Sequence, residues 1–251
     1  MPAIISIIVL SAGIATQPSD DIPASLPTVG GLSGYWRLGT GDFLPEGSFR
    51  AGAVMGARMP GGDFGTAPLS LSAAWGVGPG LEAGASIPVY VWDSVFEEGP
   101  AGDLSMGVKY LYETARGGTA LALKGMLTLP TGDLPRDRGA EARAGICTST
   151  VFRLFRLSVD AGYFASGGDD PLHARITDGI DVAVGFASYI MPETQVWVGA
   201  GTRTGSDPDA AAGVVWAPLE WLVTGVTTEA GMSDDPDFGV SVSTAVYPFF
   251  I

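Results

Sequence analysis

The chain has 251 residues, a net charge of −14 and only 16% charged residues, yet its mean hydropathy is +0.29. The acidic balance argues against nucleic-acid binding. Beyond the apolar residues 4–15, no run approaches the about 20 apolar residues of a membrane-spanning helix. Positive hydropathy without such a helix is typical of a transmembrane β-barrel, whose apolar residues are dispersed at every second strand position.

The start of the chain has the length and apolar character of a secretory signal peptide. Small residues Gly13 and Ala15 precede an expected cleavage after Ala15, so residues 1–15 are predicted to be removed. Residues 16–47 are rich in Pro, Gly, Ser and Asp and predict an irregular periplasmic lead-in or a small plug. The sequence does not decide whether residues 34–38 form a short strand or a plug at the barrel mouth.

Alternation of apolar and polar side chains is clearest in residues 104–112 and 121–129, where Lys109 and Lys124 fall on the polar parity. This period of two marks strands with one apolar face. The pattern predicts strands over residues 49–58, 69–77, 81–91, 104–112, 121–129, 141–150, 155–163, 176–189, 194–204, 210–216, 220–229 and 238–249. The sequence therefore predicts an all-β fold, a transmembrane antiparallel up-and-down β-barrel of about 12 strands over residues 48–251.

The connections between these predicted strands are of two kinds. The short ones lie around residues 77–80, 114–117, 153–154, 191–193 and 217–219, and most of those that alternate with them are longer and acidic. Outer-membrane barrels have short turns on the periplasmic side and longer loops outside. We therefore expect an outer-membrane protein with both termini in the periplasm.

Four segments carry a resemblance to a known family: SFRAGAV, LSLSAAWGVGPGLEAGASIPVYV, GDLSMGVKY and LALKGMLTLPTGD. The strand GDL-x-x-G-x-K-Y and the later L-P-T-G-D strand end resemble the MetA-pathway phenol-degradation family of outer-membrane barrel proteins. The resemblance covers residues 44–133 well and the rest weakly. It implies a porin-like channel that passes small hydrophobic or aromatic solutes across the outer membrane.

The chain ends in AVYPFFI, and the parity of its apolar residues changes near Pro248. This change predicts a bulge in the last strand. The resemblance to outer-membrane barrels implies that the barrel-insertion machinery recognises this strand. The other expected partners are the lipid bilayer, lipopolysaccharide and a small-molecule solute.

Charged residues on the polar parity should point into the barrel, because charge on the lipid face costs about 2–4 kcal/mol near the midplane. The candidate lumen-lining residues are Arg50, Arg58, Glu82, Lys109, Glu113, Lys124, Glu141, Arg143, Arg156, Asp160, Asp181 and Arg203. They predict either a paired network that braces the barrel or a slightly basic constriction that selects anions or polarised aromatics. The first reading is compatible with a structural barrel that conducts nothing.

Other chemistry has weaker support. The lone histidine, His173, lies in a loop and gives little reason to expect an outer-membrane hydrolase. Acidic pairs such as Asp169–Asp170 could hold Ca²⁺ or bridge to lipopolysaccharide, but solvated loop tips are the simpler interpretation. Trp75, Tyr110, Tyr112, Tyr163 and Trp221 are interpreted as interfacial or lipid-facing aromatics. We therefore expect no enzyme, cofactor, metal or catalytic site.

Overall fold

The computed structural model describes residues 26–27, 33–35, 38–40, 43–59, 66–93, 101–115, 119–132, 139–152, 155–167, 178–232 and 238–247. No helix in these ranges is long and apolar enough to cross a membrane. The expected signal peptide over residues 1–15, the loop residue His173 and the predicted bulge near Pro248 lie outside the described residues.

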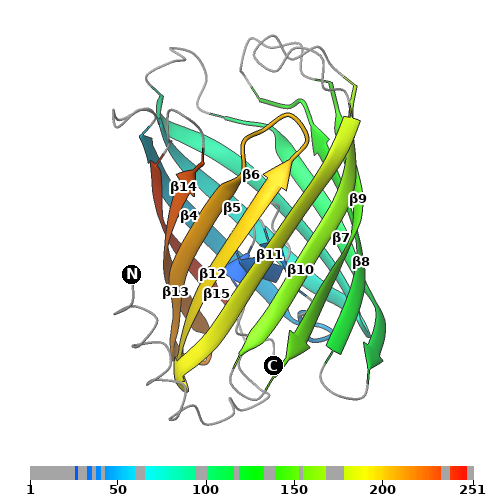
Figure 1. Cartoon of the computed structure of the whole chain (residues 1–251), viewed down its shortest axis with the longest axis vertical. Coiled ribbons are helices and arrows are strands. Elements are labelled where there is room, and N and C mark those ends of the chain that lie inside the picture. Colours follow the sequence, from blue (N-terminus) through cyan, green and yellow to red (C-terminus); the bar gives the residue numbers. More distant parts are fainter. Residues whose placement is uncertain are drawn as a thin grey trace.

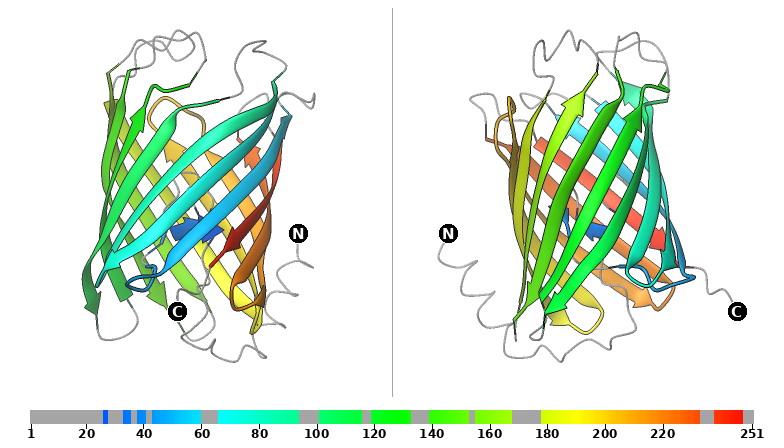
Figure 2. Two further views of the ribbon diagram at one scale, coloured as in Figure 1. Left: turned by 180° about the vertical axis from the view of Figure 1, so that it is seen from behind. Right: turned by 90° about the vertical axis from the view of Figure 1, so that its right-hand side faces the viewer.

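The described residues form a closed ring of twelve antiparallel strands (Figures 1 and 2). The ring closes where the last strand pairs with the first, from Phe238 opposite Met59 to Val246 opposite Ala51. The predicted antiparallel barrel is thus confirmed. Its strands are β4 (Phe49–Met59), β5 (Thr66–Gly78), β6 (Leu81–Asp93), β7 (Leu104–Ala115), β8 (Thr119–Leu129), β9 (Glu141–Val151), β10 (Arg156–Ser166), β11 (Asp178–Met191), β12 (Thr194–Arg203), β13 (Asp209–Leu219), β14 (Leu222–Gly231) and β15 (Phe238–Val246).

Two strands are longer than predicted and include a proline that lies just outside the predicted range. β5 begins at Thr66 rather than residue 69, and its register with β6 shifts between Ala67 and Pro68. β13 runs to Leu219 rather than residue 216, and its register with β14 shifts between Trp216 and Leu219, across Pro218. The expected turn at residues 217–219 was therefore wrong. Proline cannot donate to the ladder, and a local irregularity accommodates it without ending the strand.

The outer face of the barrel is apolar. Large side chains that a soluble protein would bury are exposed, including Val108 at 53%, Ile146 at 48% and Val226 at 48%. All five aromatics expected at the interface are exposed: Trp75, Tyr110, Tyr112, Tyr163 and Trp221. This outer face can be stable only against an apolar medium.

The barrel has two distinct ends. The connections at residues 79–80, 116–118, 152–155, 192–193 and 220–221 lie at one end, which we call the short-turn end. The connections at residues 60–65, 94–103, 130–140, 167–177, 204–208 and 232–237 lie at the other, the long-loop end. β4 starts at the short-turn end, so the residues that precede it reach the barrel from there.

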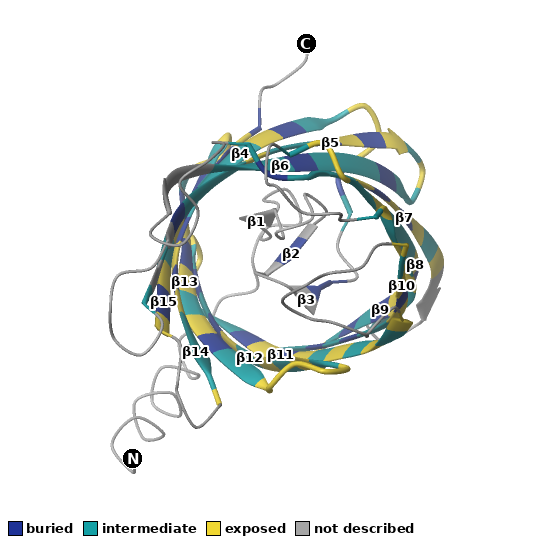
Figure 3. Cartoon of the chain, turned by 90° about the horizontal axis from the view of Figure 1, so that it is seen from above, coloured by how far each residue is buried: buried dark blue, intermediate teal, exposed yellow. Residues whose placement is uncertain are grey.

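The described residues before β4, which we call the inner segment, are residues 26–27, 33–35, 38–40 and 43–48. They include a three-stranded sheet of β1 (Leu26–Pro27), β2 (Ser33–Tyr35) and β3 (Leu38–Gly39). Figure 3 shows this sheet inside the ring of barrel strands. β3 contacts β10 and β11, whereas β1 contacts β14 and β15. The sheet therefore contacts two parts of the inner wall that are separated by β12 and β13.

The inner face of the barrel divides into two chemically different walls. The buried charged groups of the described residues come from β4, β6, β7 and β10: Arg50, Glu82, Lys109 and Asp160. The apolar cluster comes mainly from β11 to β15 and from residues that flank the barrel strands. Its members are Leu44, Ala74, Ala187, Trp197, Ala211, Val215, Ala217, Val223, Ala245 and Tyr247.

Candidate functional site in the barrel interior

One buried ion-pair cluster joins β4, β6 and β7. Glu82 forms ion pairs with both cations: Arg50 Nη2 lies 3.9 Å from Oε1, and Lys109 Nζ lies 3.8 Å from Oε2. All three side chains are at most 1% exposed. β5 separates β4 from β6, and it presents the small residues Ala74 and Gly76 on this face. Small side chains on β5 leave room for Arg50 to reach across to Glu82.

This cluster also holds the inner segment. The backbone N–H of Leu44 donates to Glu82 Oε2 at 3.2 Å, and Lys109 Nζ donates to the carbonyl of Thr40 at 3.3 Å. Lys109 Nζ further lies 4.8 Å from the ring centroid of Phe43, which adds a cation–π contact. A buried charge is stable only when it is paired and hydrogen-bonded. The inner segment supplies some of the hydrogen bonds that these buried charges need.

A second buried cluster lies on β8, β9 and β10. Lys124 forms an ion pair with Asp160 Oδ1, and Asp160 Oδ2 accepts the backbone N–H of Gly39 at 2.7 Å. Cys147 Sγ donates to the same Thr40 carbonyl that Lys109 binds, at 3.3 Å. The backbone between residues 39 and 44 is thus bound by side chains from four different barrel strands.

A third cluster lies at the long-loop end and is half-exposed. Glu141 Oε1 accepts Arg143 Nε at 2.5 Å, and Glu141 Oε2 accepts Arg203 Nη2 at 2.5 Å. The guanidinium carbon of Arg203 lies 3.6 Å from the ring centroid of Phe164, and that of Arg143 lies 6.0 Å away. The two arginines keep 31% and 32% of their side chains exposed. This cluster is therefore open to the lumen.

The remaining candidates are Asp181, Arg156, Arg58 and Glu113. Asp181 is half-buried, lies opposite Arg203 in the β11–β12 ladder, and its Oδ1 is buried without a hydrogen-bond partner in the described residues. Arg156 is half-buried at the start of β10. The side chains of Arg58 and Glu113 lie outside the described residues. The register of β7 with β8 shifts between Leu111 and Glu113, an irregularity that simple alternation did not predict.

Sequence reasoning missed several groups of the interior. The backbone groups of Gly39, Thr40 and Leu44 bind the wall, and no pattern of side chains in the sequence indicates such backbone contacts. Cys147 had a usable signal, because it shares the parity of Arg143 on β9. The register places Asp209 opposite Gly201 and Glu229 opposite Ala211, at the long-loop end. The sequence pattern placed Asp209 in a loop and Glu229 at the end of a strand.

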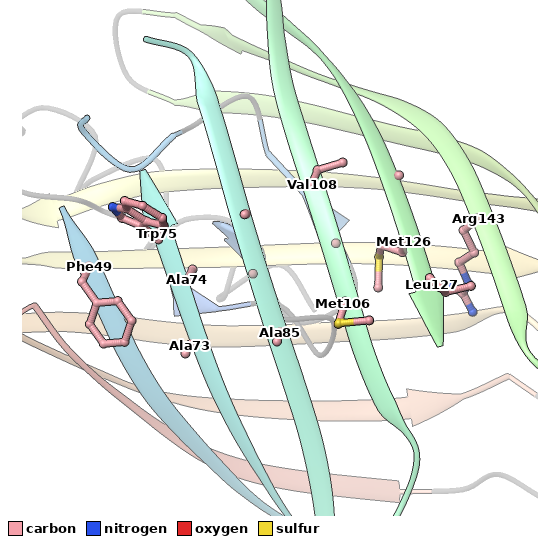
Figure 4. Close-up of a pocket in the computed structure, with 14 residues that line it drawn as sticks. Phe49, Ala73, Ala74, Trp75, Ala85, Met106, Val108, Met126, Leu127 and Arg143 are labelled. Carbon is pink, nitrogen blue, oxygen red and sulfur yellow. The ribbon is translucent and has the colours of Figure 1, made fainter. Parts of the chain in front are cut away.

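A hollow is lined by residues from β4 to β9. In Figure 4, Phe49 and Trp75 stand at one side and Met106 and Leu127 at the other, with the small residue Ala85 between them. Trp75, Met106 and Leu127 belong to the exposed outer face, whereas Arg143, which also lines the hollow, belongs to the third cluster.

No group of three or more His, Cys, Asp or Glu side chains in the described ranges is placed to hold a metal ion. The acidic pair Asp169–Asp170 lies outside those ranges, so its interpretation as a solvated loop tip and not a Ca²⁺ site stays a prediction.

No protein-family model matches the chain, and no curated protein matches its sequence. Solved structures do share its fold. An outer-membrane channel from Pseudomonas putida F1 has a TM-score of 0.61 at 11% identity, with 93% of this chain and 100% of that chain covered. The NanC porin has a TM-score of 0.59 at 7% identity, with 78% and 98% covered. Outer membrane phospholipase A from Escherichia coli has a TM-score of 0.52 at 11% identity, with 96% and 97% covered.

At these identities the likeness shows the fold, which channels and at least one enzyme share. The fold agrees with the outer-membrane part of the resemblance described above, whereas membership of the phenol-degradation family stays a prediction. The chain has the closed antiparallel barrel fold of outer-membrane proteins.

Proposed function

We propose that the protein is an outer-membrane channel through which small solutes diffuse passively. The observation that carries the proposal is a closed barrel with exposed apolar residues outside and ionisable groups inside. A purely structural barrel needs no open, charged group in its lumen, and the half-exposed cluster of Glu141, Arg143 and Arg203 is such a group. The fold likeness to an outer-membrane channel and a porin supports the same function.

The proposed solutes are small and include aromatic compounds. The family resemblance supports this class. Trp197, Val215 and Val223 make the inside of β12, β13 and β14 apolar, but they are at most 3% exposed, so they do not themselves offer a surface to a solute.

The proposed placement puts the short-turn end and both termini in the periplasm, and the long-loop end against lipopolysaccharide. It includes removal of residues 1–15 and delivery by the barrel-insertion machinery. Cysteine labelling tests the orientation, because Cys147 is fully buried and should not react. A membrane-impermeant maleimide should label Ser206→Cys on intact cells, and Glu193→Cys only after the outer membrane is permeabilised. The reverse pattern would contradict the orientation.

Conductance in planar bilayers, together with flux of benzyl alcohol into liposomes, tests the channel itself. We expect discrete conductance steps and solute flux above the rate of protein-free liposomes. The outward-facing variant Val108→Ala is the matched control and should conduct like the unmodified chain. Folded protein that gives neither conductance nor flux would contradict the proposal.

A second candidate function, a structural barrel that conducts nothing, is favoured by one observation: both buried clusters bind the inner segment. A disulfide can fix this segment. A Cβ built on Gly39 lies 3.5 Å from Cys147 Cβ, within the range of a disulfide, and 2.6 Å from Asp160 Oδ2, so the Asp160 carboxylate must shift to admit it. Gly39→Cys should therefore cross-link to Cys147, and Gly39→Cys with Cys147→Ser is the control.

The cross-linked protein separates the two candidates. A structural barrel conducts in neither the oxidised nor the reduced form. A channel conducts at least after reduction. Equal conductance in both forms would mean that solutes pass beside the inner segment while it stays bound to the wall.

A further inference from the structure

Four side chains from three strands form the half-exposed cluster at the long-loop end. Glu141 and Arg143 lie near the start of β9, Phe164 lies on β10, and Arg203 is the last residue of β12. β11 stands between Phe164 and Arg203 and presents Gly179 there, opposite Phe164. A Cβ at Gly179 would lie 3.0 Å from Phe164 Cζ and closer still to Thr204. The missing side chain thus leaves room for Arg203 to lie over the Phe164 ring.

The arginines of this cluster retain hydrogen-bonding capacity. Each donates one N–H to a different oxygen of Glu141, whereas a guanidinium has five N–H donors. Phe164 is 1% exposed, so it serves as a floor under the guanidinium groups and is not itself open to a ligand. The three ionised groups carry a net charge of +1. Asp181 lies opposite Arg203 in the ladder, but it forms no ion pair with it within 4.0 Å.

Burial separates this cluster from the other two. Arg50 and Lys109 are 1% exposed, and Lys124 is 13% exposed. A solute in the lumen cannot reach these cations while the inner segment covers them. The ion pairs of Arg143 and Arg203 are more exposed than those of Arg50, Lys109 and Lys124.

We propose that Arg143 and Arg203 form a transient binding site for the carboxylate of a small solute, and so favour carboxylates among the solutes of the channel. Glu141 shows that the two guanidinium groups are spaced to share one carboxylate, with one oxygen for each arginine. Planar recognition of carboxylates is the chemistry to which arginine is best suited. The neutralising charge of Glu141 keeps binding weak, as a site on a diffusion path requires. The inference deepens the proposed channel function and rests on it.

Benzoate is the probe, because it combines an aromatic ring with a carboxylate, and benzyl alcohol is its uncharged counterpart. We measure benzoate binding to the detergent-solubilised protein by titration calorimetry, and ion selectivity by reversal potentials in bilayers. Arg143→Gln and Arg203→Gln should each weaken benzoate binding about tenfold, the loss expected for one charge-assisted hydrogen bond. They should also shift the reversal potential towards cations, and leave benzyl alcohol flux unchanged.

Further substitutions separate the effect of the competing carboxylate from that of the guanidinium shape. Glu141→Gln removes the competing carboxylate and should tighten benzoate binding, more than Asp181→Asn does, because only Glu141 contacts both arginines. Arg203→Lys keeps the charge without the planar fork. It should retain the anion preference but bind benzoate more weakly. This conservative variant also serves if a glutamine variant fails to fold.

Arg156→Gln is the matched control, since it removes the same charge from the other end of β10. An equal loss of benzoate binding in this control, or no change in any variant of the cluster, would overturn the carboxylate site. Benzoate binding by a protein that carries no current would support the site and contradict the channel. Current without benzoate binding would support the channel and contradict the carboxylate site.

Discussion

The barrel holds two sets of ion pairs that consist of the same residue types and differ in surroundings. Glu82 with Arg50 and Lys109, and Asp160 with Lys124, are buried and bind the inner segment. Glu141 with Arg143 and Arg203 is half-exposed, and the two arginines lie over the Phe164 ring instead of binding the inner segment. An inward charge in a barrel is therefore not by itself a pore-lining charge. Its role depends on whether the inner segment covers it or leaves it exposed.

The comparison also changes which residues should report on the pore. From the sequence, Lys109 and Lys124 are natural choices for testing ion selectivity, since they point away from lipid. In the structure each lysine already forms an ion pair with a carboxylate, and Lys109 also donates a hydrogen bond to the Thr40 carbonyl. Arg143 and Arg203 are better probes, because a passing solute can contact them.

The largest effect is expected at Glu82. Glu82→Ala leaves Arg50 and Lys109 buried without their shared carboxylate, and breaking a buried pair in this way costs about 3–5 kcal/mol. Guanidinium unfolding in detergent, followed by tryptophan fluorescence, measures the loss. Glu141→Ala is the matched control from the half-exposed cluster and should cost far less. Equal losses would show that burial does not distinguish the clusters.

A smaller loss is expected at Asp160. Asp160→Asn keeps the shape of the side chain but removes the charge that Lys124 pairs with and the acceptor strength that Gly39 uses. A hydrogen bond to a charged group contributes about 1.5–3 kcal/mol. The unfolding midpoint should fall accordingly. Because the variant loosens residue 39, the yield of the Gly39→Cys cross-link to Cys147 should fall as well. An unchanged yield would mean that Asp160 does not position the inner segment.

The smallest effect on stability is expected at Arg203. Arg203→Gln removes a pair that is about one-third exposed, and exposed pairs contribute about 0–1 kcal/mol. The same variant is expected to change ion selectivity and benzoate binding. Glu82→Ala should thus lower the unfolding midpoint more than Arg203→Gln does. Arg203→Gln should shift the reversal potential more than Glu82→Ala does. A large loss of stability from Arg203→Gln would make this cluster a structural brace.

Much of the barrel could be predicted from alternation alone. A strand that faces an apolar medium on one side must repeat with a period of two, so Leu104 to Tyr112 revealed both a strand and its outer face. The exceptions are local: Pro68 and Pro218 did not end their strands, and β7 shifts register at Glu113. Such irregularities depend on the partner strand, which a single segment of sequence does not contain.

The sequence by itself determined that these residues build a barrel wall and, for strands such as β7 and β8, which parity faces inwards, because both follow from the period of the strand and the polarity of its side chains. Only the tertiary structure decided which inward charges meet. Arg50 reaches Glu82 across β5, and Arg203 reaches Phe164 across Gly179, through contacts that depend on the register of several strands. The tertiary structure also placed the backbone of residues 39–44 against the buried clusters, since backbone groups carry no sequence signal.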